Sequence, residues 1–157
     1  MAYYDNVNPD LLASIPLNAQ KVLEIGCGKG NFGRAYKEQN PTVEYTGVEL
    51  FKDAALHASK YLDHVICGDI EQTKILAKLE KSLKGKKFDT LIFGDVLEHL
   101  MEPSDVLKNL YPLVANGGMC IACVPNVGHW TLLQQLLKGR WDYADSGLLD
   151  RTHLRFF

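Results

Sequence analysis

The chain has 157 residues, a length typical of one domain, and 46% of them are hydrophobic, enough to form a packed core. Its 17 basic and 19 acidic residues give a formal net charge of −2, so we expect no nucleic-acid partner. The polar N-terminus is unlike a signal peptide, no apolar run is long enough to cross a membrane, and the cysteine pattern does not suggest disulfides, so we expect one cytoplasmic domain over residues 1–157.

Short apolar segments alternate with helical patterns along the chain, as in proteins built from βαβ units. The predicted strands are Lys21–Gly26, Glu44–Glu49, His64–Cys67, Phe88–Gly94 and Gly118–Val124. The predicted helices are Gly30–Gln39, Lys52–Leu62, Glu71–Lys84, Ser104–Val114 and Thr131–Lys138. Pro112 should kink or end the fourth of these helices. The pattern predicts an α/β fold with an open, doubly wound sheet, which binds ligands beyond the carboxyl ends of its strands.

A glycine-rich turn follows the first predicted strand. Residues 22–30 read Val-Leu-Glu-Ile-Gly-Cys-Gly-Lys-Gly, and glycines let a backbone turn tightly and approach a ligand closely. The segment resembles motif I of class I S-adenosylmethionine (SAM)-dependent methyltransferases, whose pattern is acidic-x-Gly-x-Gly-x-Gly. The candidate cofactor-binding residues of this turn are Glu24, Gly26, Cys27, Gly28 and Gly30.

A dinucleotide site is the rival interpretation of the same turn. Gly28, Gly30 and Gly33 satisfy the G-x-G-x-x-G pattern, and Glu49 follows at the distance expected of a ribose-binding acid. The carboxylate of Glu24 favours SAM, because a negative charge before the turn is unfavourable beside a pyrophosphate but tolerable near an ammonium group. The glycine run also begins at Gly26, before Gly28, which is the first glycine of the dinucleotide-binding pattern.

Further cofactor candidates lie at the ends of the next three predicted strands. Glu49, followed by Leu50, ends the second strand, where its carboxylate can accept hydrogen bonds from both hydroxyls of a ribose. Asp69 and Ile70 follow the third strand, and the resemblance implies contacts with the adenine amino group and the adenine ring. Asp69 also suits a cap on the helix that follows. Asp95 follows the fourth strand and would lie beside the methionine moiety of SAM.

The resemblance extends over nearly the whole chain. Residues 88–100 resemble the fourth-strand motif and the x-x-Leu-Glu-His segment of methyltransferases that act on small metabolites, quinones and surface sugars. The tail at 139–143 and 149–157 is similar to bacterial methyltransferase domains found with glycosyltransferases of cell-surface polysaccharides. The family implies a Rossmann-like sheet of order 3-2-1-4-5, normally continued by strands six and seven. We expect this chain to be truncated before those strands, and the exposed fifth strand to favour a homodimer.

Methyl transfer from SAM needs alignment of the acceptor, exclusion of water and, for a hydroxyl, removal of a proton. His99 and His153 are the candidate catalytic residues, because histidine side chains titrate near neutral pH. His129 is a further candidate, and a surface or packing role is the simpler interpretation of any one of the three.

A metal-binding alternative remains open, although no metal is expected among the site residues. Asp95, Glu98 and His99 would share one face of a helix, and His153 would join them from the tail. A similar set of residues binds a divalent metal in small-RNA 2′-O-methyltransferases, and ubiquinone-pathway O-methyltransferases carry a related Glu–His segment.

The sequence therefore predicts a SAM-dependent methyltransferase acting on a small-molecule or carbohydrate acceptor, at oxygen, without a membrane partner. An NAD(P)-binding oxidoreductase domain and a non-catalytic SAM-binding module are the alternatives. Cys120 and Cys123 form no redox pair in this interpretation, because residues three apart on a strand face opposite sides. Tyr3 and Tyr4 are candidates to cover the substrate entrance, or else a loosely packed terminus. The acceptor itself cannot be inferred from the fold.

Overall fold

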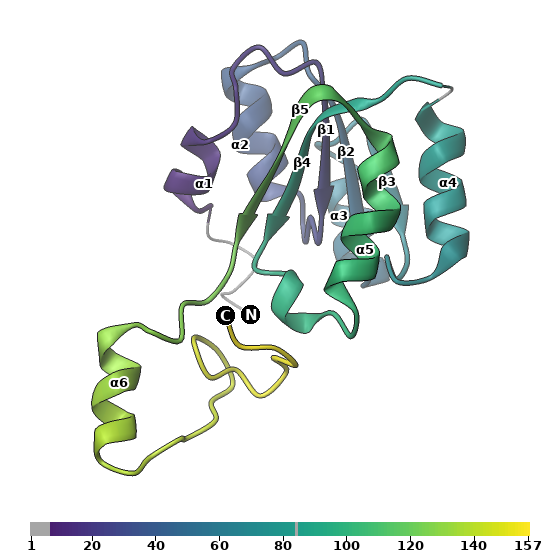
Figure 1. Cartoon of the computed structure of the whole chain (residues 1–157). Helices are drawn as coiled ribbons and strands as arrows, with labels where there is room; N and C mark the ends of the chain where they lie inside the picture. The colour runs from purple at the N-terminus through teal and green to yellow at the C-terminus, as the bar shows by residue number, and fades with distance from the viewer. Residues whose placement is uncertain (1–6, 84) are drawn as a thin grey trace.

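The computed structural model describes residues 7–83 and 85–157, so Tyr3, Tyr4 and Lys84 lie outside the described part. A five-stranded sheet forms the centre of the molecule, with every neighbouring pair of strands parallel (Figure 1). The strand order is β3-β2-β1-β4-β5, as predicted. The strands are β1 (Lys21–Ile25), β2 (Glu44–Glu49), β3 (His64–Cys67), β4 (Phe88–Gly94) and β5 (Val114–Cys123).

Helices follow the strands and cover both faces of the sheet (Figure 1). Apolar residues recur at helical spacing in the longer helices, so one side of each packs on the sheet. The helices are α1 (Pro9–Ala13), α2 (Asn31–Gln39), α3 (Lys52–Ala58), α4 (Thr73–Leu83), η2 (Leu97–His99), α5 (Pro103–Leu110), η3 (Tyr111–Leu113) and α6 (Trp130–Leu137).

Two hydrophobic cores result, one on each face of the sheet. Strand residues such as Leu23 and Phe93 pack with Leu79 of α4 and Leu110 of α5, all at most 1% exposed. The opposite core joins α1, α2 and α3 to the sheet, and its members are Leu11, Ile15, Ala19, Val22, Cys27, Tyr36, Val43, Tyr45, Ala58, Leu62 and Ile92. Burial on both faces explains the largely apolar sequences of the inner strands β1 and β4.

The structure confirms the bounds of β2, β3 and β4, and it corrects several others. The fourth predicted helix ends at Leu110, because the segment around Pro112 tightens into η3, as a proline there should cause. β5 begins at Val114, four residues before its predicted start at Gly118. The short elements α1 and η2 were not predicted, because neither is long enough to show an apolar period.

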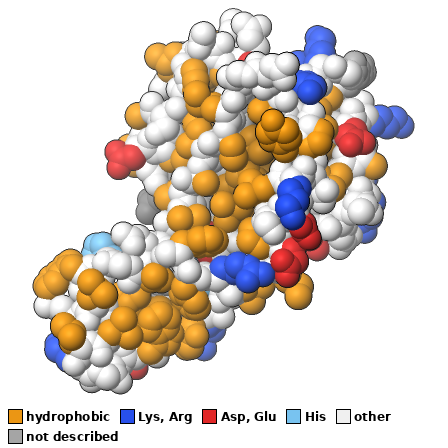
Figure 2. Space-filling model, viewed as in Figure 1, with side chains coloured by type: hydrophobic (Ala, Val, Ile, Leu, Met, Phe, Trp, Pro, Cys, Tyr) orange, Lys and Arg blue, Asp and Glu red, His pale blue; other side chains and the backbone are white. Residues whose placement is uncertain are grey.

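After β5 the chain leaves the sheet, forms α6 and returns in a tail towards the carboxyl end of β4 (Figure 1). Figure 2 shows hydrophobic side chains gathered over this part and over the neighbouring sheet surface. The exposed apolar residues of α6 and the tail are Trp130, Leu133, Leu136, Leu137, Trp141, Tyr143, Leu154, Phe156 and Phe157. No helix among the described residues is long and apolar enough to span a membrane.

Candidate functional site

The glycine turn after β1 is fixed against β2. The backbone N–H groups of Gly26 and Cys27 both donate to the carbonyl of Val48, at 2.8 and 3.1 Å. Gly26, Gly28 and Gly30 all have positive φ angles, of 74°, 53° and 81°, a region that L side chains rarely adopt. The backbone conformation of the turn therefore favours glycine at all three positions.

Glu49 lies at the end of β2 with its side chain turned into the glycine turn. One carboxylate oxygen accepts the Gly28 N–H at 2.8 Å, and the other accepts the Phe51 N–H at 2.8 Å. The side chain is only 4% exposed, but each oxygen keeps a lone pair for a further donor. Leu50 and Phe51 beside it are each 57% exposed, so apolar side-chain surface lies next to the carboxylate. This arrangement suits a ribose with an attached base.

Glu24 lies beneath the turn and is 5% exposed. The Tyr45 hydroxyl donates to its carboxylate at 3.0 Å. Burial raises the pKa of Glu24 to about 8, with the hydrogen bond from Tyr45 opposing the rise and the nearby Glu49 adding to it. Burial likewise raises the pKa of the neighbouring Cys27 thiol, so this side chain stays protonated. Glu24 is thus a buried carboxyl group whose ionised form a nearby positive charge would favour.

Asp69 and Ile70 follow β3 at the same edge of the sheet. Asp69 accepts hydrogen bonds from the Glu71 N–H at 3.0 Å and from the side chain of Gln72 at 3.3 Å. This is the behaviour of a residue that stabilises the turn before a helix, here α4. The side chain of Ile70 is 6% exposed and belongs to the core beneath α4 and α5.

Asp95 follows β4 and has a φ angle of 53°, rare for a residue with a side chain. Its N–H donates to the carbonyl of Cys123 at 3.1 Å, which ties it to β5. The prediction that Asp95, Glu98 and His99 share one helical face is wrong, because only Leu97–His99 is helical and Asp95 lies outside it. A strained backbone at a strand end is a common feature of binding sites.

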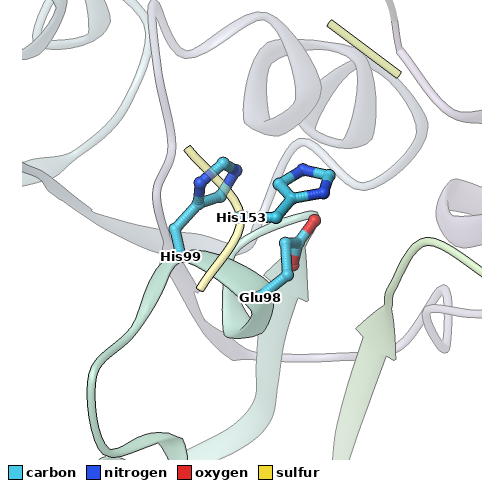
Figure 3. Close-up of side chains that lie close together, drawn as sticks. All are labelled: Glu98, His99 and His153. Atoms are coloured by element: carbon cyan, nitrogen blue, oxygen red, sulfur yellow. The ribbon is translucent and has the colours of Figure 1, made fainter. Parts of the chain in front are cut away.

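The tail brings His153 against Glu98 and His99 (Figure 3). The backbone N–H groups of Leu154 and Arg155 donate to the carbonyl of Glu98 at 2.8 and 3.1 Å. The rings of the two histidines lie with their centroids 4.8 Å apart and nearly perpendicular. Glu98 is 0% exposed, and burial raises the pKa of its carboxyl. Both candidate catalytic histidines therefore belong to one cluster.

Most of the other candidate residues lie at the same edge of the sheet as this cluster, but not all of them do. The residues that end β1, β2, β3 and β4 share one edge of the parallel sheet, where the cluster after β4 also lies. His129 instead is the N-cap of α6, where its ring accepts the Thr131 N–H at 3.4 Å. Cys120 and Cys123 are free cysteines on β5, as are Cys27 and Cys67 elsewhere.

Sequence reasoning missed two residues of this region. Tyr45 is the hydrogen-bond partner of Glu24, and nothing in the sequence links two residues on neighbouring strands. Thr152 contacts His99 through its carbonyl at 3.3 Å and its hydroxyl at 3.2 Å. The return of the tail that makes this contact has no local sequence signal.

Comparison with known proteins identifies the class. Residues 23–120 match the model of a family described as a methyltransferase domain, which is more than half of the chain. The fold also matches the plantazolicin methyltransferase BpumL in complex with SAH, with a TM-score of 0.61, 22% identity and coverage of 79% of this chain and 45% of that one. An O-methyltransferase family protein from Burkholderia thailandensis matches with a TM-score of 0.58, 16% identity and coverage of 82% and 42%.

The chain belongs to the methyltransferase domain family, with the Rossmann-like fold of class I SAM-dependent methyltransferases. Its similarity to the ubiquinone biosynthesis O-methyltransferase of Psychrobacter arcticus is distant, at 26% identity over 155 residues. That alignment covers 90% of this chain and 58% of the relative, so the chain spans little more than half of the relative's length. The family match favours the methyltransferase interpretation over the dinucleotide-dependent oxidoreductase.

Proposed function

We propose that this chain binds SAM at the carboxyl edge of its sheet and transfers the methyl group to an oxygen of a small-molecule or carbohydrate acceptor. The observation that carries the proposal is the coupling of Glu49 to the glycine turn. The Gly28 N–H donates to a carboxylate that is 4% exposed, beside three glycines in left-handed conformations. A ribose and a flat base fit this arrangement.

Each part of the cofactor has residues suited to it. Glu49 would hold the ribose hydroxyls, with Leu50, Asp69 and Ile70 around the adenine. Gly26, Cys27, Gly28 and Gly30 would pass beside the methionine moiety. Glu24 would lie on the far side of the turn from the ammonium group of the methionine moiety. Asp95 would lie near the sulfonium of SAM. A cation near a buried carboxyl favours the ionised form, so cofactor binding should draw the proton from Glu24.

The chemistry is an in-line displacement. The acceptor oxygen forms a bond to the methyl carbon while the bond from that carbon to sulfur breaks, and S-adenosylhomocysteine (SAH) leaves. The hydroxyl proton must leave as well, and His99 and His153 supply imidazole nitrogens at this edge. Most of the rate enhancement would come from alignment and exclusion of water, because the sulfonium is already activated.

Transfer to oxygen is supported by the relatives, since the P. arcticus protein and the B. thailandensis protein are both described as O-methyltransferases. A non-catalytic SAM-binding module is the second candidate. It is favoured by the fact that the contacts of Glu49 with the glycine turn concern the cofactor alone and not an acceptor.

Turnover with labelled SAM separates the two candidates. The chain would be incubated with methyl-labelled SAM and a panel of catechols, simple phenols, hydroxy acids and sugars, and SAH release would be followed. We expect label in at least one hydroxylated acceptor and a stoichiometric amount of SAH. Tight SAH binding without label in any acceptor would contradict the enzyme and favour the binding module.

A further inference from the structure

We infer that Glu98, His99 and His153 form a binding site for one divalent transition-metal ion. Each of these residues offers a ligand atom, and the three atoms lie within 4.8 Å of one another. The inference deepens the proposed function, since three protein ligands would leave coordination positions open for water or for an acceptor hydroxyl. An imidazole nitrogen bound to an ion has no lone pair left for a proton, so with an ion bound His99 and His153 would be ligands, and the ion would ease loss of the acceptor proton by lowering the pKa of the coordinated hydroxyl.

The first argument is an unsatisfied buried carboxylate. Glu98 is 0% exposed, yet neither of its carboxylate oxygens has a hydrogen-bond partner within residues 7–83 and 85–157. Nδ1 of His153, a residue that is 6% exposed, also has no partner in this described part. Buried polar atoms are normally paired, and a buried carboxylate without a partner is costly. A cation placed among these side chains would satisfy them together.

The second argument is the orientation of the His99 ring. Its Nδ1 lies 3.3 Å from the carbonyl oxygen of Thr152, and a carbonyl can only accept a hydrogen bond. The contact is therefore a hydrogen bond when Nδ1 carries the proton, which leaves the lone pair on Nε2. Metal-binding histidines typically donate their other N–H to a backbone carbonyl or carboxylate in this way. The ring is thus held in the tautomer and orientation of a ligand.

The third argument is the frame that holds the three side chains. Glu98 and His99 belong to η2, immediately after β4, and the tail is attached to η2 through hydrogen bonds from Leu154 and Arg155 to the carbonyl of Glu98. In Figure 3 the carboxylate of Glu98 and the ring of His153 project towards the same space, with the ring of His99 beside them. Ligand atoms on one ion lie about 3–3.5 Å apart, so the widest pair would close by about 1.5 Å, within reach of side-chain rotations.

The ligand atoms of these three residues indicate which metal ions the site would bind. Two imidazoles and one carboxylate with open positions are typical of sites for Fe²⁺, Mn²⁺, Co²⁺ or Zn²⁺, whereas Mg²⁺ and Ca²⁺ prefer oxygen ligands alone. Mn²⁺ is the best probe here, because the exposed thiols of Cys67 and Cys120 would compete for softer ions.

The test is titration of the metal-free chain with Mn²⁺ in the absence of SAM. Calorimetry measures the binding, and thermal unfolding measures its effect on stability. We expect one Mn²⁺ per chain, a rise in the unfolding midpoint, and weaker or no binding of Mg²⁺ at the same concentration. Glu98→Gln and His153→Asn should each weaken Mn²⁺ binding at least tenfold. The matched controls are Glu38→Gln and His64→Asn, exposed residues outside the cluster that should leave binding unchanged.

Unfolding of the metal-free variants shows whether they remain folded. Glu98→Gln removes a buried charge without a partner, so the variant should be at least as stable as the parent without metal. No Mn²⁺ binding by the parent, or binding that survives both Glu98→Gln and His153→Asn, would overturn the inference. Because the titration needs neither SAM nor an acceptor, its outcome is independent of whether methyl transfer is found.

Discussion

Three buried glutamates show how the surroundings of a carboxyl group decide its role. Glu49 accepts two backbone N–H groups, Glu24 accepts a single tyrosine hydroxyl, and Glu98 has no partner in the described part of the chain. Hydrogen bonds stabilise the ionised form, whereas burial alone favours the protonated form. We therefore propose that Glu49 binds the ribose, that Glu24 responds to a cationic ligand, and that Glu98 binds a metal ion.

Glu49→Gln should weaken SAH binding about tenfold to a hundredfold. Hydrogen bonds to charged groups contribute about 1.5–3 kcal/mol, and the amide keeps only one accepting oxygen for the Gly28 N–H, the Phe51 N–H and the ribose. Isothermal titration calorimetry with SAH measures the change, with the exposed Glu38→Gln as control. A dissociation constant unchanged by Glu49→Gln would exclude the proposed ribose contact.

Glu24→Gln should change how stability depends on pH. The pKa of Glu24 is about 8 in the folded chain against an ordinary value of 4.5, so between these values the folded state holds a proton that the unfolded chain releases. The free energy of unfolding therefore falls as pH rises through this window, by up to about 1.4 kcal/mol per pH unit from this group.

Urea unfolding between pH 5 and pH 9 tests this expectation. Glu24→Gln should remove the fall, so that the variant gains stability relative to the parent as pH rises to about 8, with no further gain above it. A difference between parent and variant that is the same at every pH would show that Glu24 does not titrate in this range.

At the scale of elements, the sheet and most helices were predictable because their signals are local. β2 and β4 are mostly buried between two layers, β3 is a short strand at the sheet edge, and the sequence predicts the bounds of all three as observed. The strand-end positions of Glu49 and Asp69 followed from the same pattern. The assignment of their roles in cofactor binding stays a prediction.

Other features depend on contacts between distant segments and were not predictable. Asp95 combines a left-handed conformation with a hydrogen bond to β5, and the three-residue helix η2 is too short to have a period. The Tyr45–Glu24 bond joins two strands, and the position of His153 depends on the path of the whole tail. A sequence pattern shows which residues share a face of one element, but not which elements meet.

Gly30 joins β1 to α2 and passes close to α3, so we expect Gly30→Ala to destabilise the fold by about 2 kcal/mol or more. A Cβ at this position would lie 2.9 Å from the Cα of Ala58, and the φ angle of 81° adds the cost of a left-handed residue. Gly139→Ala is the matched control, because its φ angle is 69° but a Cβ there would meet no atom within 4 Å.

Chemical denaturation of both variants separates the steric cost of a Cβ close to Ala58 from the cost of a left-handed backbone conformation. The loss in Gly30→Ala should exceed the loss in Gly139→Ala by about 1 kcal/mol or more, as expected of overpacking. Equal losses would mean that the contact between the turn and α3 is looser than the structure shows.

At the scale of the whole molecule, β5 is one of the two edge strands of the described sheet, and the tail carries an apolar surface (Figure 2). An exposed strand edge can pair with another chain, so we predict that the chain self-associates at high concentration. Met119→Lys places a charge on β5 and should shift the molecule towards the monomer in light scattering. A parent chain that stays monomeric at every concentration would contradict this prediction.

The central claim is that the carboxyl edge of this sheet is a SAM site. The most direct test is thermal unfolding of the 157-residue chain with SAM, SAH or NAD, because a ligand that binds only the folded state raises the midpoint. We predict that SAM and SAH raise the midpoint and that NAD does not. A rise with NAD, and none with SAM or SAH, would contradict the account and make the glycine turn a dinucleotide site.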